Sequence, residues 1–135
     1  MGGIFGEGID LTGEKLIGVI VVGTGIPQVG PERELLKDFF DEKNGCGFDY
    51  AYRYPGMNKV QQAAGRVIRT TSDRGVILLL DERFSRQENR ELFPVEWADA
   101  RACTLRSAGE EIRIFWDGQL KKFDKGDPAD YNNTQ

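Results

Sequence analysis

The residues whose types and spacing most clearly suggest a functional site are Gln62, Arg66 and Arg69. They lie at positions i, i+4 and i+7 of a segment predicted to be helical over 55–69. This spacing gathers one amide and two guanidinium groups along one stripe of the helix, and such a forked set of donors suits phosphate oxygens. Gly65 precedes Arg66 and costs about 1 kcal/mol relative to alanine in a helix interior, which favours a position that a ligand approaches. A solvated helix face has the same appearance, so both interpretations stay open.

A second candidate is the glycine-rich segment 6–10, in which two glycines flank an acidic residue and Asp10 follows. Backbone N–H groups of such a segment can face a ligand while Asp10 accepts hydrogen bonds, although a tight turn before a strand would look the same. A dinucleotide-binding fingerprint is also suggested by Gly23 and Gly25 after a predicted strand. That fingerprint fails, because Gln28 stands where the third glycine is needed.

A third pattern is a run of alternating aromatic residues: Phe48, Tyr50, Tyr52 and Tyr54. Strict alternation predicts an extended segment over residues 46–54. The rings could stack on nucleic-acid bases, but more often such alternation forms one packed face of an edge strand.

Composition excludes several classes of site. The 135 residues include no histidine, so His-dependent nucleophilic triads and His-ligated metal centres are excluded. The two cysteines, Cys46 and Cys103, are far apart and predict neither a metal cage nor an iron–sulfur site in this chain. The net charge of −4 means that any nucleic-acid role depends on a local basic cluster or a partner domain. Without an apolar run of membrane-spanning length or a signal peptide, we expect a cytoplasmic protein with no membrane partner.

The elements that must position these residues alternate between strand and helix. Two short β-branched and aliphatic runs, 16–22 and 76–80, predict strands buried on both faces of a parallel sheet. The fold class is therefore α/β, with a parallel sheet flanked by helices. Between the two strands we expect a helix over 31–43, with one buried face and an end at Asn44-Gly45. After the second strand we expect a helix with a weak apolar pattern over 84–93 and a short strand over 102–105. A capping box from Ser107 to Glu110 then begins a last helix, and a polar tail follows from 118.

Two of these segments together resemble a known family. Residues 6–10 (GEGID) resemble motif V of superfamily 2 helicases, and residues 62–69 (QAAGRVIR) resemble their motif VI, of form QxxGRxxR. The intervening and later segments are similar to the DinG/XPD-type branch, so that the resemblance covers roughly residues 3–97; they are Gly25-Ile-Pro27, the 31–43 helix, Tyr54-Pro55-Gly56, Asp81-Glu-Arg-Phe84, Leu92-Phe-Pro94 and Trp97.

In that family two RecA-like domains enclose ATP and single-stranded DNA lies across both, and motifs V and VI belong to the second domain. The resemblance implies that Arg66 and Arg69 act as arginine fingers on the γ-phosphate of ATP. It also implies a wider set of contacts: Gln62, Gly65, Glu7, Gly8 and Asp10 at the ATP site, and Thr24, Gly6 and Tyr52 at the nucleic acid.

Two motifs of the family pattern are missing from this sequence, and their absence determines what else we expect of the chain. No GxxxxGK[ST] phosphate loop and no acidic Mg²⁺ motif occur in the sequence, so ATP and Mg²⁺ are expected to be bound mainly by an N-terminal helicase domain of the same polypeptide. We therefore expect the C-terminal piece of a helicase. It consists of a RecA-like domain over 1–117, truncated at its N-terminal side, and a polar tail over 118–135. We expect that this piece does not hydrolyse ATP alone. The alternatives are a stand-alone RecA-like module that binds nucleic acid or a helicase without catalysis, and an unrelated small α/β nucleotide- or phosphate-binding protein.

Overall fold

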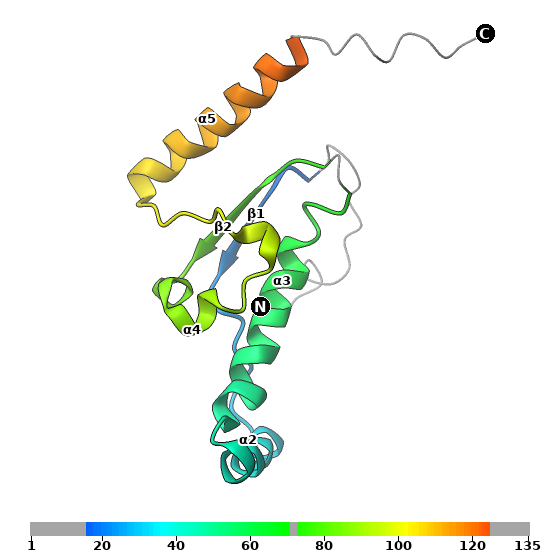
Figure 1. Ribbon diagram of the computed structural model, residues 1–135, viewed down its shortest axis with the longest axis vertical. Helices are drawn as coiled ribbons and strands as arrows, with labels where there is room; N and C mark the ends of the chain where they lie inside the picture. The colour runs from blue at the N-terminus through cyan, green and yellow to red at the C-terminus, as the bar shows by residue number, and fades with distance from the viewer. Residues whose placement is uncertain (1–15, 71–72, 125–135) are drawn as a thin grey trace, which may run out of the picture. The chain divides into compact units, whose positions relative to one another are not determined.

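The computed structural model describes residues 16–70 and 73–124, with side chains described up to residue 118. The chain divides into two compact units, Met1–Ala100 and Arg101–Gln135. In the described part of the first unit, a sheet of two parallel strands packs against the helix α3 (Tyr54–Ala64) (Figure 1). The predicted α/β class with parallel strands is confirmed.

The sheet consists of β1 (Gly18–Val22) and β2 (Val76–Leu80), which pair in parallel with Gly18 opposite Val76 and Val22 opposite Leu80. Both strands lie within the ranges predicted from their aliphatic runs. Burial on both faces was wrong for β1, because only one of its faces is covered by the described residues. Val21 is 2% exposed, whereas its neighbour Val22 is 69% exposed.

Helix α2 (Pro31–Asn44) forms where the sequence predicts it, with Pro31 in the first turn. It ends at Gly45, whose φ of 72° is the left-handed conformation that glycine adopts without a steric penalty. The predicted buried face is not found among the described residues, since Leu35 is 71% and Phe39 is 55% exposed.

The predicted extended segment over 46–54 is wrong, because this stretch is helical. It forms a π-helical turn, Asp49–Arg53, that continues into α3 (Tyr54–Ala64). The alternating aromatics satisfy helical i, i+4 contacts instead, as in the stacked pair Phe48 and Tyr52 with ring centroids 5.5 Å apart. Long-range bonds fix the conformation, including one of 2.9 Å from the Arg33 guanidinium to the Ala51 carbonyl.

Helix α3 ends five residues earlier than predicted, at Ala64 rather than 69. The backbone then turns through Gly65, and Val67 enters the core with only 4% exposed. A Cβ at Gly75 would lie 2.1 Å from a methyl carbon of Val67, so this path depends on a glycine facing Val67.

The core lies between the sheet, α3 and the chain after β2. Its buried members are Val21, Met57, Val60 and Phe84. The chain after β2 is helical only in short pieces rather than over all of 84–93; these are a 3-10 turn over Glu82–Ser85, α4 (Gln87–Arg90) and a 3-10 turn over Val95–Trp97. Figure 1 places α4 near the edge of the sheet where both strands end.

The second unit contains α5 (Leu105–Asp124), which begins where a strand over 102–105 was expected. No strand occurs at 102–105, because the Thr104 hydroxyl accepts the Ser107 N–H and the Ser107 hydroxyl accepts the Thr104 N–H, which caps a helix one turn before the predicted capping box. The expected domain boundary between 117 and 118 falls inside this helix rather than at the start of a tail. Among the described residues, no helix combines the length and apolar character that crossing a membrane requires.

Candidate functional site

The structure separates the three residues that were expected on one helical stripe. Gln62 lies exposed in the last turn of α3, Arg66 lies in the turn after the helix, and Arg69 lies in the irregular segment beyond. The predicted single stripe is therefore wrong, because α3 ends before Arg66. The neighbouring Gln61 has a structural role, since its side-chain amide donates to the Leu92 carbonyl at 2.6 Å.

The backbone around Arg66 is nevertheless well anchored. Ala64, two residues before it, is 1% exposed and Val67, directly after it, is 4% exposed. The Gly65 N–H donates to the Gln61 carbonyl at 2.8 Å, which closes the helix, and the Val67 N–H donates to the Ala64 carbonyl at 3.0 Å. Arg66 is thus displayed from a turn whose two ends are buried in the core.

The segment with Arg69 is shaped by Asp73, four residues further along the chain. One carboxylate oxygen of Asp73 accepts the backbone N–H groups of Arg69 at 2.9 Å and Thr70 at 2.8 Å. These bonds to the charged form lower the pKa of Asp73. The carboxylate therefore fixes the backbone that carries Arg69.

Thr24 lies at the carboxyl end of β1, with 3% of its surface exposed. Its hydroxyl has no hydrogen-bond partner among the described residues, although buried hydroxyls are normally bonded. The loop at Thr24 packs directly on α3, because a Cβ at Gly56 would lie 2.7 Å from the Thr24 carbonyl oxygen.

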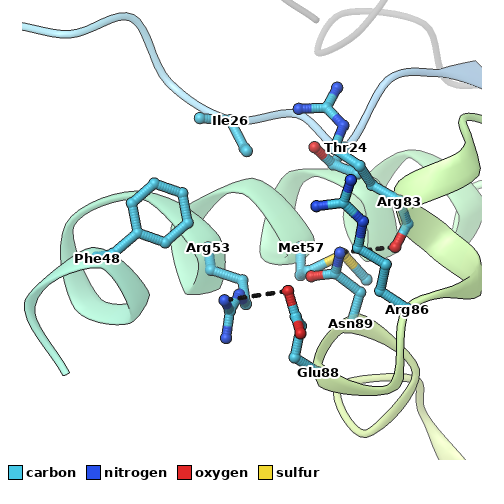
Figure 2. Close-up of a pocket in the computed structure, with 9 residues that line it drawn as sticks. All are labelled: Thr24, Ile26, Phe48, Arg53, Met57, Arg83, Arg86, Glu88 and Asn89. Atoms are coloured by element: carbon cyan, nitrogen blue, oxygen red, sulfur yellow. Dashed lines mark hydrogen bonds and ion pairs between the residues drawn. The ribbon is translucent and has the colours of Figure 1, made fainter.

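A pocket of about 230 Å³ opens beside Thr24, at the edge where the parallel strands end (Figure 2). Ligands of open α/β sheets commonly bind at this edge. The lining comes from the loop after β1, the helical stretch before α3, α3 itself and the chain after β2: Thr24, Ile26, Phe48, Arg53, Met57, Arg83, Arg86, Glu88 and Asn89. From the sequence, Thr24 was predicted as a site residue only through the family resemblance. Nothing in residues 81–90 (DERFSRQENR) indicated that Arg83 and Arg86 line the same pocket as Thr24.

The arginines of this pocket pair mainly with acids that lie outside its lining, and Arg53 also contacts Glu88 of the lining at 3.5 Å. Asp81 binds Arg83 through two side-chain bonds of 2.9 and 2.7 Å, and these bonds lower the pKa of Asp81 to about 2. Asp49 holds Arg53 at 2.7 Å. The lining itself therefore contains three guanidinium groups and the carboxylate of Glu88, and each guanidinium also pairs with an acid beside the lining: Asp49, Asp81 or Glu82.

Tyr52 does not present its ring for stacking on bases, in contrast to the expected nucleic-acid contact. It is 3% exposed and its hydroxyl donates to the Glu34 carboxylate. The helical conformation turns Tyr52 into the packing between α2 and the π-helical turn Asp49–Arg53. The expected ligands Gly6, Glu7, Gly8 and Asp10 lie outside the described residues.

Comparison with known proteins identifies the family. A model described as the helicase C-terminal domain matches residues 1–100. The chain belongs to this helicase family. It is 35% identical over 116 residues to regulator of telomere elongation helicase 1 from Bos taurus, covering 79% of this chain and 10% of the relative. It is 32% identical over 127 residues to ATP-dependent DNA helicase chl-1 from Caenorhabditis elegans, covering 90% of this chain and 15% of the relative.

A third relative is the general transcription and DNA repair factor IIH helicase subunit XPD from Dictyostelium discoideum, 30% identical over 94 residues, covering 67% of this chain and 12% of the relative. The resemblance to DinG/XPD-type superfamily 2 helicases is confirmed. This helicase domain therefore spans about a tenth of the length of these relatives. Within residues 16–70 and 73–124, no three His, Cys, Asp or Glu side chains gather as a metal site.

Proposed function

We propose that the chain is the second motor domain of an ATP-dependent DNA helicase, in which ATP hydrolysis drives movement along a single strand and separation of a duplex. Membership in the helicase C-terminal family supports the motor role. ATP and Mg²⁺ are bound mainly by an N-terminal helicase domain of the same polypeptide. This chain completes the nucleotide site from the facing side.

The observation that carries this proposal is the anchored turn at Arg66. A finger must present its guanidinium to the γ-phosphate at a fixed position, because charge develops there only in the transition state. The buried neighbours Ala64 and Val67 hold the backbone of Arg66 in place. Arg69 is the second finger, on a segment held by Asp73, and Gln62 and Gly65 flank the phosphates.

The glycine-rich segment that carries Glu7, Gly8 and Asp10 couples this nucleotide site to the strand, and Gly6 and Thr24 contact the strand itself. Closure of the two motor domains places the fingers, so hydrolysis and movement are linked. On this proposal the isolated chain has no ATPase activity, because it holds only half of a composite site.

The test uses the helicase polypeptide that contains this domain, assayed for DNA-stimulated ATP hydrolysis. Arg66→Ala lowers kcat by about 10³-fold or more, the range that an arginine finger supplies. Lys59→Ala, an exposed cation on α3, is the matched control and leaves kcat unchanged. Turnover by the isolated chain that is lost in Arg66→Ala would contradict the composite site and favour a self-sufficient nucleotide-binding protein.

A further inference from the structure

Helix α2 turns its polar side toward the protein and its apolar side outward. On the inner side the Arg33 guanidinium donates to the Ala51 carbonyl at 2.9 Å, and Glu34 accepts a hydroxyl from the same π-helical turn. On the outer side Leu35 is 71% and Phe39 is 55% exposed. A surface helix normally turns its apolar stripe toward the core, so the outward stripe of α2 is a candidate contact surface for another molecule.

The outward side chains form two parallel ridges along α2. Leu35 and Phe39 form the first ridge at spacing i, i+4. Leu36 and Phe40 form the second ridge at the same spacing, and Leu36 is 40% exposed. Tyr50 supports the second ridge from behind, because its ring stacks on that of Phe40 with centroids 4.0 Å apart. Adjacent i, i+4 ridges are the surface against which another helix packs.

Acidic side chains predominate beside these ridges. By helical spacing the charged residues that border them are Glu32, Asp38, Glu42 and Lys43. Asp38 has only a long contact of 3.8 Å to Lys37, and among the described side chains neither Glu32 nor Glu42 forms an ion pair. The Lys43 ammonium lies 5.7 Å from the centre of the Phe39 ring. The border is therefore net acidic, and a molecule that covers the ridges meets carboxylates with few partners.

The charge and dimensions of this surface favour a basic helix over a second copy of the chain. The stripe belongs to one helix of 14 residues, about 21 Å long at 1.5 Å per residue, which a single partner helix can cover. A second copy would bring one net acidic border against another, and like charges oppose association. An amphipathic helix with Lys or Arg beside its apolar stripe instead pairs its cations with these carboxylates.

We propose that the outward stripe of α2, formed by Leu35, Leu36 and Phe39, docks a basic amphipathic helix of a partner protein. The partner's apolar side chains pack against the two ridges, and its Lys or Arg side chains face Asp38 and Glu42. Figure 1 shows α2 beside the start of α3, at the end away from both strands. The stripe shares no residue with the lining of the Thr24 pocket or with the proposed fingers, so the interaction goes beyond the motor function.

The experiment measures fluorescence anisotropy of a labelled synthetic peptide on titration with the 135-residue chain. The peptide matches α2 in length and carries leucines at i, i+3, i+4 and i+7 with lysines beside them. A covalent side-chain bridge keeps it helical, because isolated helices of this length are marginal in water. A second peptide has glutamate in place of every lysine. We expect the basic peptide to bind about tenfold or more tightly than the acidic one, with a difference that shrinks as salt is added.

Variants of the ridges test the apolar part of the contact. Phe39→Ala and Leu35→Ala each lower the affinity for the basic peptide by about fivefold to tenfold. Leu35→Ala keeps the unfolding temperature of wild type, because Leu35 is mainly exposed and makes no ring contact, so its effect on affinity is not a folding effect. Val95→Ala, at an aliphatic position outside α2 that is 82% exposed, is the matched control and leaves the affinity unchanged.

A variant of the border tests the charged part. Glu42→Gln lowers the affinity for the basic peptide about twofold to threefold and weakens its salt dependence, because one carboxylate of the border is lost. Glu96→Gln, the same substitution at an exposed position outside α2, is the control and changes neither quantity.

The proposal is overturned if the basic peptide does not bind, if both peptides bind equally, or if Leu35→Ala and Phe39→Ala bind as wild type does. Sedimentation that shows a dimer of the wild-type chain and a monomer of Phe39→Ala would assign the stripe to a second copy instead. Binding by the isolated chain but not by the helicase polypeptide would mean that another segment of that polypeptide covers the stripe. These outcomes leave the proposed finger untouched, because the kcat of Arg66→Ala tests that residue separately.

Discussion

The ion pair of Asp81 and Arg83 predicts a specific dependence of stability on pH. The Arg83 bonds lower the pKa of the Asp81 carboxyl from 3.8 to about 2. That difference corresponds to about 2.4 kcal/mol of differential stabilisation of the charged form. Because the Arg83 side chain is 39% exposed, solvent screening reduces the expected contribution to about 1–2 kcal/mol.

The sign follows from the direction of the pKa change. A carboxyl whose pKa is lower in the folded state stabilises the fold above its unfolded pKa, and this contribution is lost as the pH falls from about 4 toward about 2. Asp81→Asn removes the charge but keeps an oxygen that can accept the Arg83 backbone N–H, as Asp81 does at 2.9 Å. The substitution therefore isolates the ion pair from the cap of the following turn.

The assay is urea unfolding of wild type and Asp81→Asn at pH 7, 4 and 3, followed by circular dichroism. We expect the free energy of unfolding to differ by about 1–2 kcal/mol at pH 7, and about half of this difference to remain at pH 3. Asp99→Asn, the same substitution at an exposed position, is the control for the exchange of a carboxylate for an amide. A difference that stays constant from pH 7 to 3, or no difference at pH 7, would refute the assignment.

Two further predictions concern the packing that positions the pocket. Gly56→Ala places a Cβ 2.7 Å from the Thr24 carbonyl oxygen and destabilises the fold by about 1–3 kcal/mol in thermal unfolding. Gly109→Ala in α5 stabilises the helix by about 0.5–1 kcal/mol, because a Cβ at Gly109 has no neighbouring atom within 4 Å. Equal effects of the two would contradict the packing of the Thr24 loop on α3. Tyr52→Phe removes the bond to Glu34 and lowers the unfolding temperature by a few degrees, but leaves oligothymidine affinity unchanged. A selective loss of affinity in Tyr52→Phe would show that this tyrosine reaches the strand.

The parts of the fold that local chemistry determines were predictable from sequence. The β-branched run in β1 and the aliphatic run in β2 marked the strands, and Pro31 and Gly45 marked the ends of α2. The α/β class followed from these elements, because short buried strands alternating with helices favour a parallel sheet.

The errors arose where distant contacts override a local pattern. Period-two aromatics over 46–54 looked extended, yet the same rings also satisfy i, i+4 contacts, and the bond from Arg33 to Ala51 selects the helix. The end of α3 depends on Val67 fitting against Gly75, a contact between two segments that a helical pattern does not encode.

The candidate site was predictable only in part, for the same reason. Motif VI gave the identities of Gln62, Arg66 and Arg69 through a family resemblance, but their arrangement on one helix was wrong. The Thr24 pocket joins the ends of both strands, so the placement of Arg86 in the same lining as Thr24 emerges only when the parallel register brings those ends to one edge.

The central claim is that Arg66 acts on ATP from a domain that cannot hydrolyse it alone. The most direct measurement is the kcat of DNA-stimulated ATP hydrolysis by the helicase polypeptide and by the isolated chain, each as wild type and as Arg66→Ala. The proposal predicts no turnover by the isolated chain and a fall of about 10³-fold or more in the polypeptide on substitution of Arg66. An unchanged kcat in the Arg66→Ala polypeptide, or Arg66-dependent turnover by the isolated chain, would contradict it.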